Sequence, residues 1–154
     1  MLYIAITVVK FLMMSKKVLI YVAGPTAVGK TTYSIKLAKE LNTEIISCDS
    51  RQCYKEMQIG TAVPSQEELN EVPHHFIQHK SIFESFDAGD FEREALVLLQ
   101  ELFKTKDNVV MVGGSGLYAK ALMEGLDQFP LVNETAKNTI ATAHNQNGIE
   151  GLQQ

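Results

Sequence analysis

The chain has 154 residues, which is enough for one domain of ordinary size but not for two. Hydrophobic residues make up 45% and charged residues 21%, and these proportions exclude a disordered or fibrous chain. A net charge of -4 argues against a protein that coats nucleic acid through bulk charge. Two cysteines cannot build a disulfide framework, so we expect a cytoplasmic protein.

The chain begins with an apolar run over residues 1–14, MLYIAITVVKFLMM. This run is shorter than the roughly 20 residues of a membrane-spanning helix, and it lacks the basic start and the cleavage site of a secretory signal. Because Met13 and Met14 are both possible starts, we expect residues 1–15 to be a leader or extension outside the core. An added edge strand and a targeting segment are the alternatives, and no membrane partner is expected.

Strands and helices are then predicted to alternate. Apolar, β-rich runs typical of strands buried on both faces occupy residues 18–23, 44–47 and 109–112. Amphipathic helices are predicted over residues 31–41, from 87 or 90 to about 105, and over 117–124. This order indicates an α/β fold with a parallel sheet, whose core we place at residues 16–127.

Two other parts of the chain carry weaker patterns. Residues 48–80 are polar and rich in turn-forming residues, so no regular element is predicted there. From residue 128 onward the apolar pattern thins. We expect residues 128–154 to be the start of a truncated insert or a linker.

A glycine-rich motif follows the first core strand. Its residues fit G-x-x-x-x-G-K-[ST] at every fixed position: Gly24, Pro25, Thr26, Ala27, Val28, Gly29, Lys30 and Thr31. In such a loop, backbone N–H groups surround phosphate oxygens, the lysine adds a positive charge, and the threonine offers a hydroxyl to Mg²⁺. The motif predicts binding of a nucleotide or another diphosphate, and leaves open whether a P–O or a C–O bond breaks.

Asp49 stands just after the second predicted strand. Ligands of open α/β sheets bind beyond the carboxyl ends of the strands, so we expect Asp49 to face the same crevice as the glycine-rich loop. A carboxylate there can be a general base, a Mg²⁺ partner or a turn former. The third predicted strand is followed by glycine in place of aspartate, which weakens an ATPase or GTPase interpretation.

Several segments together resemble one family. GPTAVGKT, DSRQ, IGTAVPSQEEL, VPHHFI, FDAGDFEREA and VGGSGLYAKALMEGL occur in this order between about residues 17 and 130, and they resemble the tRNA dimethylallyltransferases (tRNA isopentenyltransferases). The resemblance implies a P-loop NTPase-like three-layer fold with a parallel sheet, truncated here because family chains are about twice as long. It also implies transfer of a dimethylallyl group from dimethylallyl diphosphate to the exocyclic amine of an adenosine beside the tRNA anticodon, with Mg²⁺.

The resemblance also implies roles for individual residues. Residues 26–31 would hold the diphosphate, Thr31 would contact Mg²⁺, and Asp49 would be the general base for the amine. The residues implied to contact tRNA are Asp49, Ser50, Arg51, Gln52, Ser115 and Lys137. Ser115 stands where the family usually has Thr, and Lys137 falls near a place where relatives usually carry Arg. The expected partners are tRNA and dimethylallyl diphosphate, and we favour a monomer.

Three other functions remain alternatives. A small-molecule P-loop kinase would use Asp49 as the base for a hydroxyl, but its lid is rich in arginines and this chain has only Arg51 and Arg93. An adenylate isopentenyltransferase would accept a free nucleotide in place of tRNA. A non-catalytic fragment would bind diphosphate without turnover.

Other reactive side chains are interpreted as structural. His74, His75 and His79 could suggest a zinc site, since His75 and His79 are four residues apart. Such a spacing brings two ligands together on a helix, but Pro73 and the β-rich residues 76–77 oppose a helix here, so a zinc site is disfavoured. We expect these histidines to be structural, with a polar role at the active site as the alternative. We expect Cys48 and Cys53 to be buried or inert, and Tyr118 to belong to the core.

Overall fold

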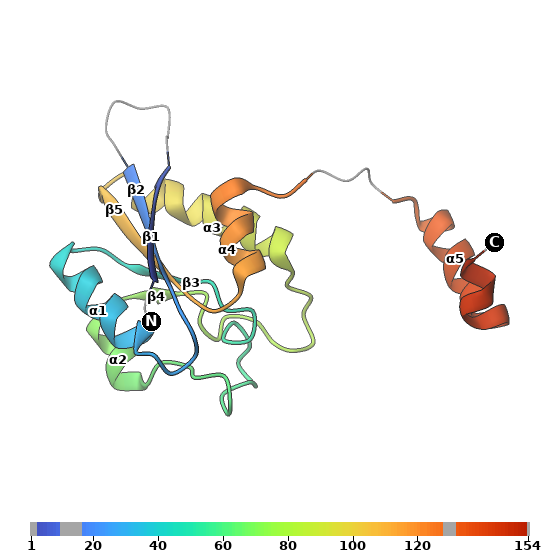
Figure 1. The fold of residues 1–154 in the computed structure, drawn as a ribbon, viewed down its shortest axis with the longest axis horizontal. Coiled ribbons are helices and arrows are strands. Elements are labelled where there is room, and N and C mark those ends of the chain that lie inside the picture. The colour runs from blue at the N-terminus through green and yellow to red at the C-terminus, as the bar shows by residue number, and fades with distance from the viewer. Residues whose placement is uncertain (1–2, 10–16, 128–131, 154) are drawn as a thin grey trace.

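The computed structural model describes residues 3–9, 17–127 and 132–153 (Figure 1). The strands are β1 (Tyr3–Val9), β2 (Lys17–Ala23), β3 (Ile45–Ser47), β4 (His74–His75) and β5 (Asn108–Val112). The helices are α1 (Lys30–Glu40), α2 (Gln66–Glu71), α3 (Ala88–Leu102), α4 (Gly116–Glu124) and α5 (Glu134–Asn147), and a 3-10 turn covers Gly148–Leu152.

The described strands form one sheet in the order β1-β2-β5-β3-β4. From β2 to β4 all neighbours are parallel, with Ile20 opposite Val110 and Ile46 opposite Met111. The predicted parallel sheet is thereby confirmed. The carboxyl ends of β2, β3 and β5 lie at the same edge, which is where ligands of such sheets bind.

Helices cover both faces of this sheet. Leu19, Ile46 and Met111 pack in one cluster with the buried stripes of α3 and α4, whereas Ile45 and Val110 pack in a second cluster with α1. In Figure 1, α1 lies on one side of the strands and α3 and α4 lie on the other. The alternation of side chains along each strand divides the core between the two faces. The P-loop NTPase-like three-layer fold is confirmed.

The second long helix, α3, begins after Asp87, the first of the two candidate capping residues. The Asp87 carboxylate accepts hydrogen bonds from the N–H groups of Gly89 and Asp90, and the Asp90 carboxylate accepts one from the N–H of Asp87. This reciprocal cap satisfies N–H groups that a helix start leaves unpaired. Tyr118 of α4 is buried, stacks on Phe91 of α3, and donates a hydrogen bond to the carbonyl of Phe86. Its expected place in the core is confirmed.

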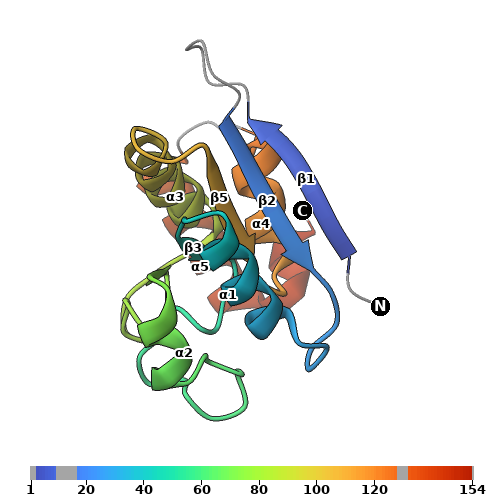
Figure 2. The same cartoon turned by 90° about the vertical axis from the view of Figure 1, so that its left-hand side faces the viewer.

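Residues 3–9, which we expected to belong to a leader or extension, are paired with the sheet. They form β1, which runs antiparallel to β2 along its whole length, from Tyr3 opposite Ala23 to Val9 opposite Lys17 (Figure 2). An unpaired edge of a sheet leaves N–H and C=O groups without partners, and an apolar, β-rich segment pairs with them readily. The alternative of an added edge strand is the correct description of these residues.

Two short elements lie inside residues 48–80, where none was predicted. Helix α2 begins after Ser65, whose hydroxyl accepts from the N–H of Glu68 while the Glu68 carboxylate accepts from the N–H of Ser65. Strand β4 pairs with β3 through His74 and His75. Within the described residues, no helix is long and apolar enough to cross a membrane.

Helix α5 is a regular element in a region where the apolar pattern predicts none. It is capped by Asn133, whose side chain accepts from the N–H of Thr135, and none of its residues is buried. Figure 1 shows it apart from the sheet and its covering helices. Local capping therefore forms this helix without a packed apolar face.

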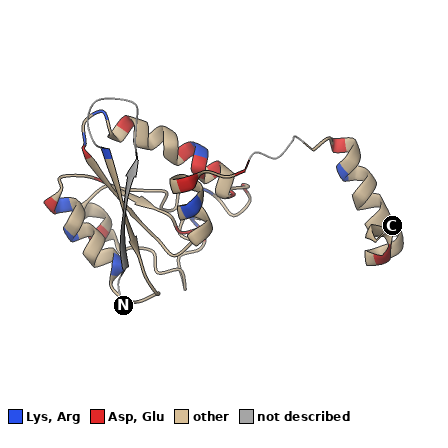
Figure 3. Cartoon of the chain, turned by 45° about the horizontal axis from the view of Figure 1, so that its top comes forward, with Lys and Arg blue, Asp and Glu red and all other residues tan. Residues whose placement is uncertain are grey.

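Charged residues of both signs are interspersed on the helices, as Figure 3 shows for α3. Arg93 pairs with Asp90 one turn earlier, and Glu94 pairs with Lys80. This arrangement is typical of a solvated helix face.

Candidate functional site

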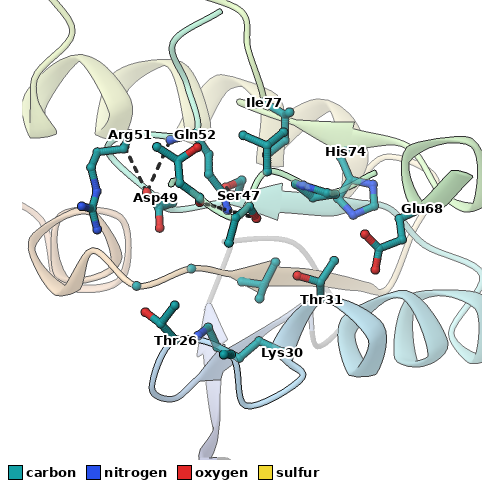
Figure 4. A pocket seen from close by; sticks show the side chains of 18 of the residues that line it. Thr26, Lys30, Thr31, Ser47, Asp49, Arg51, Gln52, Glu68, His74 and Ile77 are labelled. Atoms are coloured by element: carbon teal, nitrogen blue, oxygen red, sulfur yellow. Dashed lines mark hydrogen bonds between the residues drawn. The ribbon is translucent and has the colours of Figure 1, made fainter. Parts of the chain in front are cut away.

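A pocket of about 420 Å³ opens at the carboxyl ends of β3 and β5, beside the start of α1 (Figure 4). Segments far apart in the sequence meet there: the glycine-rich loop, the turn after β3, the loop before α2, the region around β4, and the end of β5. Among its lining residues are Thr26, Ala27, Gly29, Lys30, Thr31, Ser47, Asp49, Arg51, Gln52, Glu68, His74, Ile77, Gly113 and Gly114.

The glycine-rich loop forms one wall of the pocket. Gly29 immediately precedes α1 with a φ of 91°, a left-handed conformation that glycine adopts without strain. The Lys30 ammonium donates to the carbonyls of Gly24 and Pro25, at 2.9 and 2.7 Å. The loop, its lysine and the positive end of α1 therefore converge on the pocket, as an anion-binding site requires.

Thr31 lines the pocket directly beside Lys30. Its hydroxyl is a hard oxygen donor, the type of ligand that Mg²⁺ prefers, and Mg²⁺ in such sites takes most of its other ligands from substrate phosphates and water. The donor set at the start of α1 is thus chemically suited to a Mg²⁺–diphosphate complex.

Asp49 faces the same pocket from the turn after β3 and is half-buried. One carboxylate oxygen, Oδ1, accepts from the N–H groups of Arg51 at 3.0 Å and Gln52 at 3.4 Å. The other oxygen, Oδ2, lies beside Gly114, where a Cβ would be 3.5 Å away. The turn fixes the carboxyl group through one oxygen and directs the group into the pocket, as the sequence predicts.

A close approach between the ends of β3 and β5 supports this turn. A Cβ on Gly113 would lie 2.5 Å from the carbonyl carbon and oxygen of Cys48, so only glycine fits there.

The cysteines near this turn are buried. Burial raises the pKa of the Cys48 thiol to about 12 and that of the Tyr21 phenol to about 12, and both groups are therefore neutral at ordinary pH. Cys53 is also a buried free thiol. The expectation of inert cysteines agrees with this environment.

Ser115 lies next to the Asp49 turn although it is 65 residues away from it. Its hydroxyl accepts from the N–H of Ser50 at 2.8 Å and donates to the Ser50 hydroxyl at 3.0 Å. Lys137, in contrast, lies on α5 and pairs with Glu134 one turn earlier at 2.8 Å. The structure brings Ser115 to the other predicted residues and does not bring Lys137 there.

Several lining residues were not among the predicted site residues. They come from the loop before α2, from α2 itself and from the segment around β4: residues 60–64, Glu68, His74 and Ile77. The pattern Ser65-x-x-Glu68 is a capping signature and could have shown that a helix begins here. It could not have shown that this helix borders the pocket.

His74 takes part in the pocket wall as a neutral ring. Its Nδ1–H donates to the carbonyl of Val72 at 2.7 Å, and burial lowers the pKa of the ring below its usual value. His75 bonds to Glu44, and the ring of His79 packs edge-on against Phe76 and Phe86. No group of three or more potential metal ligands occurs in the described part of the chain.

Comparisons with known proteins identify the family of the chain. The model of the family described as "IPP transferase" matches residues 52–154. The chain belongs to the IPP transferase family. Among curated members of the IPP transferase family, the tRNA dimethylallyltransferase of Flavobacterium johnsoniae is 54% identical, covering 90% of this chain and 45% of the relative. That of Flavobacterium psychrophilum is 57% identical, covering 88% and 44%.

Solved structures of the IPP transferase family have the same fold. The tRNA isopentenylpyrophosphate transferase of Bacillus halodurans aligns with a TM-score of 0.66 and 41% identity, over 84% of this chain and 43% of that one. A eukaryotic dimethylallyltransferase acting on tRNA aligns with a TM-score of 0.71 and 25% identity, over 91% and 38%. The chain thus spans less than half the length of the relatives it matches.

Proposed function

We propose that the chain is the part of a tRNA dimethylallyltransferase that holds dimethylallyl diphosphate and supplies the base for transfer of its prenyl group to tRNA. The observation that carries the proposal is that Lys30 and Asp49 line a single pocket. The Lys30 ammonium can stabilise an anionic leaving group, and the Asp49 carboxylate can accept a proton. The family of the chain and the names of its relatives support this choice of substrates.

The phosphate loop assists departure of the leaving group. In the proposed reaction the allylic C–O bond breaks, and its electron pair leaves with the diphosphate. Charge therefore accumulates on the diphosphate oxygens, where Lys30, the loop N–H groups and the end of α1 stabilise it. Mg²⁺ held by Thr31 and the diphosphate oxygens would supply further neutralisation of this charge.

Asp49 assists the nucleophile. The exocyclic amine of adenosine is a poor nucleophile, so transfer of its proton to a carboxylate as the N–C bond forms lowers the barrier. Oδ2 is the oxygen for this proton, because Oδ1 is held by the N–H groups of Arg51 and Gln52. The adenosine must leave its stack to reach the pocket, as for other enzymes that modify a base.

The rim of the pocket provides candidate contacts for tRNA. Arg51 is exposed and lines the pocket beside Asp49. Ser50 and Ser115 are hydrogen-bonded to each other in and beside the Asp49 turn. We propose that these side chains border the bound adenosine. The two free, buried cysteines suit a reducing compartment, so we place the reaction in the cytoplasm. A monomer remains a prediction.

The deciding experiment uses labelled dimethylallyl diphosphate with Mg²⁺ and either tRNA, AMP or no acceptor. Label in tRNA supports the proposal, whereas label in AMP supports an adenylate isopentenyltransferase. Binding without transfer supports a diphosphate-binding fragment, and phosphate transfer from ATP to an alcohol supports a kinase.

Two variants separate the roles of the charged groups in the same assay. Asp49→Asn keeps an acceptor for the N–H groups of the turn, so we expect unchanged diphosphate binding and transfer slowed by about 10²–10⁴-fold. Lys30→Ala should weaken pyrophosphate binding itself. If both variants lost diphosphate binding equally, Asp49 would instead be needed for folding or for binding Mg²⁺.

A further inference from the structure

The side chain of Gln52 connects three parts of the pocket. Its Oε1 accepts from the Ser47 hydroxyl at 3.1 Å, at the end of β3. Its Nε2 donates to the carbonyls of Thr61 at 3.1 Å and Ala62 at 2.8 Å, in the loop before α2. Because a carbonyl oxygen can only accept, these contacts also fix which end of the amide is the nitrogen. Both amide hydrogens of Gln52 are therefore engaged within the chain.

The loop that Gln52 holds has a conformation that needs support. Ala62 has a φ of 51°, in the left-handed region that residues other than glycine rarely adopt. Thr61 is buried, and its hydroxyl donates to the carbonyl of Met57. The two hydrogen bonds from Gln52 satisfy consecutive carbonyls of this strained turn. Without them, this strained turn loses the two hydrogen bonds that tie it to the turn after β3.

This loop forms an apolar wall of the pocket, which we define as Ala62, Val63 and Pro64 together with Ile77. Val63, Pro64 and Ile77 are half-buried. In Figure 4, Ile77 and Gln52 lie on the opposite side of the pocket from Thr26 and Lys30 of the phosphate loop. The pocket therefore has a cationic side for an anion and an apolar side for a hydrocarbon.

We propose that Gln52 is a positioning residue that holds the apolar wall against the hydrocarbon chain of the substrate and so gives the pocket its preference for a prenyl diphosphate over inorganic pyrophosphate. This inference rests on the proposed function. It differs from the role in tRNA contact that resemblance implies for Gln52, since the amide hydrogens that would read an RNA base already bind Thr61 and Ala62.

The test compares two ligands that differ only in the apolar part. Calorimetric titration with inorganic pyrophosphate measures the phosphate loop alone, and titration with dimethylallyl diphosphate adds the contribution of the wall. In Gln52→Met, which has a similar volume without hydrogen-bonding groups, we expect pyrophosphate affinity within about twofold of the unmodified chain. We expect dimethylallyl diphosphate to bind roughly tenfold more weakly, the loss of contact for about two carbon-sized groups.

A matched control and a coupled variant sharpen the result. Gln100→Met makes the same change at an exposed position of α3 and should alter neither affinity. Val63→Ala should weaken dimethylallyl diphosphate alone, by about fourfold, which is the loss of contact for one carbon-sized group of this half-buried side chain. If Gln52 acts through the loop, this fourfold loss disappears in the double variant Gln52→Met/Val63→Ala, because the wall has already moved.

Each outcome decides a separate point. If the unmodified chain binds the two ligands equally, the proposed function and the apolar wall both fail. If it prefers dimethylallyl diphosphate and Gln52→Met keeps that preference, or if the two substitutions are additive, only the role of Gln52 is overturned. Should Gln52→Met lose cooperative unfolding, Gln52→Glu replaces it, since its carboxylate keeps the acceptor for Ser47 and repels the carbonyls of Thr61 and Ala62. The added charge repels both diphosphate ligands, so the ratio of their two affinities is the quantity compared.

Discussion

Replacing Gly113 by alanine tests the close approach that supports the Asp49 turn. The added Cβ would lie 2.5 Å from two backbone atoms of Cys48 and 2.7 Å from its sulfur. Ordinary contacts begin about 1 Å further out, and backbone atoms cannot rotate away as a side chain can. The ends of β3 and β5 must therefore separate.

The expected loss in the free energy of unfolding follows from the contacts around Gly113. Overpacking costs about 1–3 kcal/mol. The separation also strains the hydrogen bonds from the Cys48 N–H to the Val112 carbonyl and from the Ser115 N–H to the Cys48 carbonyl, at 2.8 and 3.2 Å. Loss of the weaker of these hydrogen bonds costs about 1 kcal/mol. Together with the overpacking, this loss should lower the free energy of unfolding by about 2–4 kcal/mol. For a chain of this size the melting temperature should drop by roughly 10 °C.

Thermal unfolding followed by circular dichroism measures this change, with Gly114→Ala as the matched control. A Cβ at position 114 would meet only the Asp49 Oδ2, at 3.5 Å, which is an ordinary contact. Its stability should therefore stay within about 0.5 kcal/mol of the unmodified chain. If Gly113→Ala has the same melting temperature as Gly114→Ala, the reasoning is refuted, because β3 and β5 could then accept a side chain at their closest point.

Three further predictions concern stability and reactivity. Burial and the Lys80 charge lower the pKa of His79 in the folded chain. As the pH falls below about 6.5, the unfolded chain therefore binds a proton at this histidine more readily than the folded chain does, and the folded chain loses stability. Urea midpoints should consequently be lower at pH 5.5 than at pH 7.5, and less so in His79→Gln. Cys48 and Cys53, with pKa values raised by burial to about 12 and about 11, should resist iodoacetamide at pH 8 until urea unfolds the chain; rapid labelling of the native chain would contradict their burial. Asp87→Ala removes the cap of α3 and should lower the free energy of unfolding by about 1 kcal/mol, whereas an unchanged urea midpoint would show that the cap contributes little.

The main elements and one half of the site could be predicted because local signals determine them. Apolar runs predicted the central strands, and two candidate caps, Asp87 and Asp90, placed the start of α3 to within three residues. The glycine-rich motif predicted both an anion site and the helix after it. Asp49 could be placed because the carboxyl ends of parallel strands meet at one edge.

The parts that could not be predicted depend on pairing between distant segments. His74 and His75 are too short a run to show a strand, and β4 exists because β3 offers an unpaired edge. Residues 3–9 were predicted to be an extension because their sequence does not show that β2 lacks a second neighbour. The wall held by Gln52 likewise depends on hydrogen bonds to carbonyls nine and ten positions away, and composition does not encode them.

The hydrogen bonds of Lys30 to its own loop have a consequence for selectivity. An ammonium group that already holds two carbonyl oxygens exchanges partners when a ligand arrives, so the incoming anion must offer more than Gly24 and Pro25 already provide. Hydrogen bonds between an ammonium and a charged oxygen are stronger than those to a neutral carbonyl, so an anion can displace these two carbonyls more readily than a neutral ligand can. Any ligand that pairs with Lys30 therefore has its affinity reduced by the two hydrogen bonds that Gly24 and Pro25 give up.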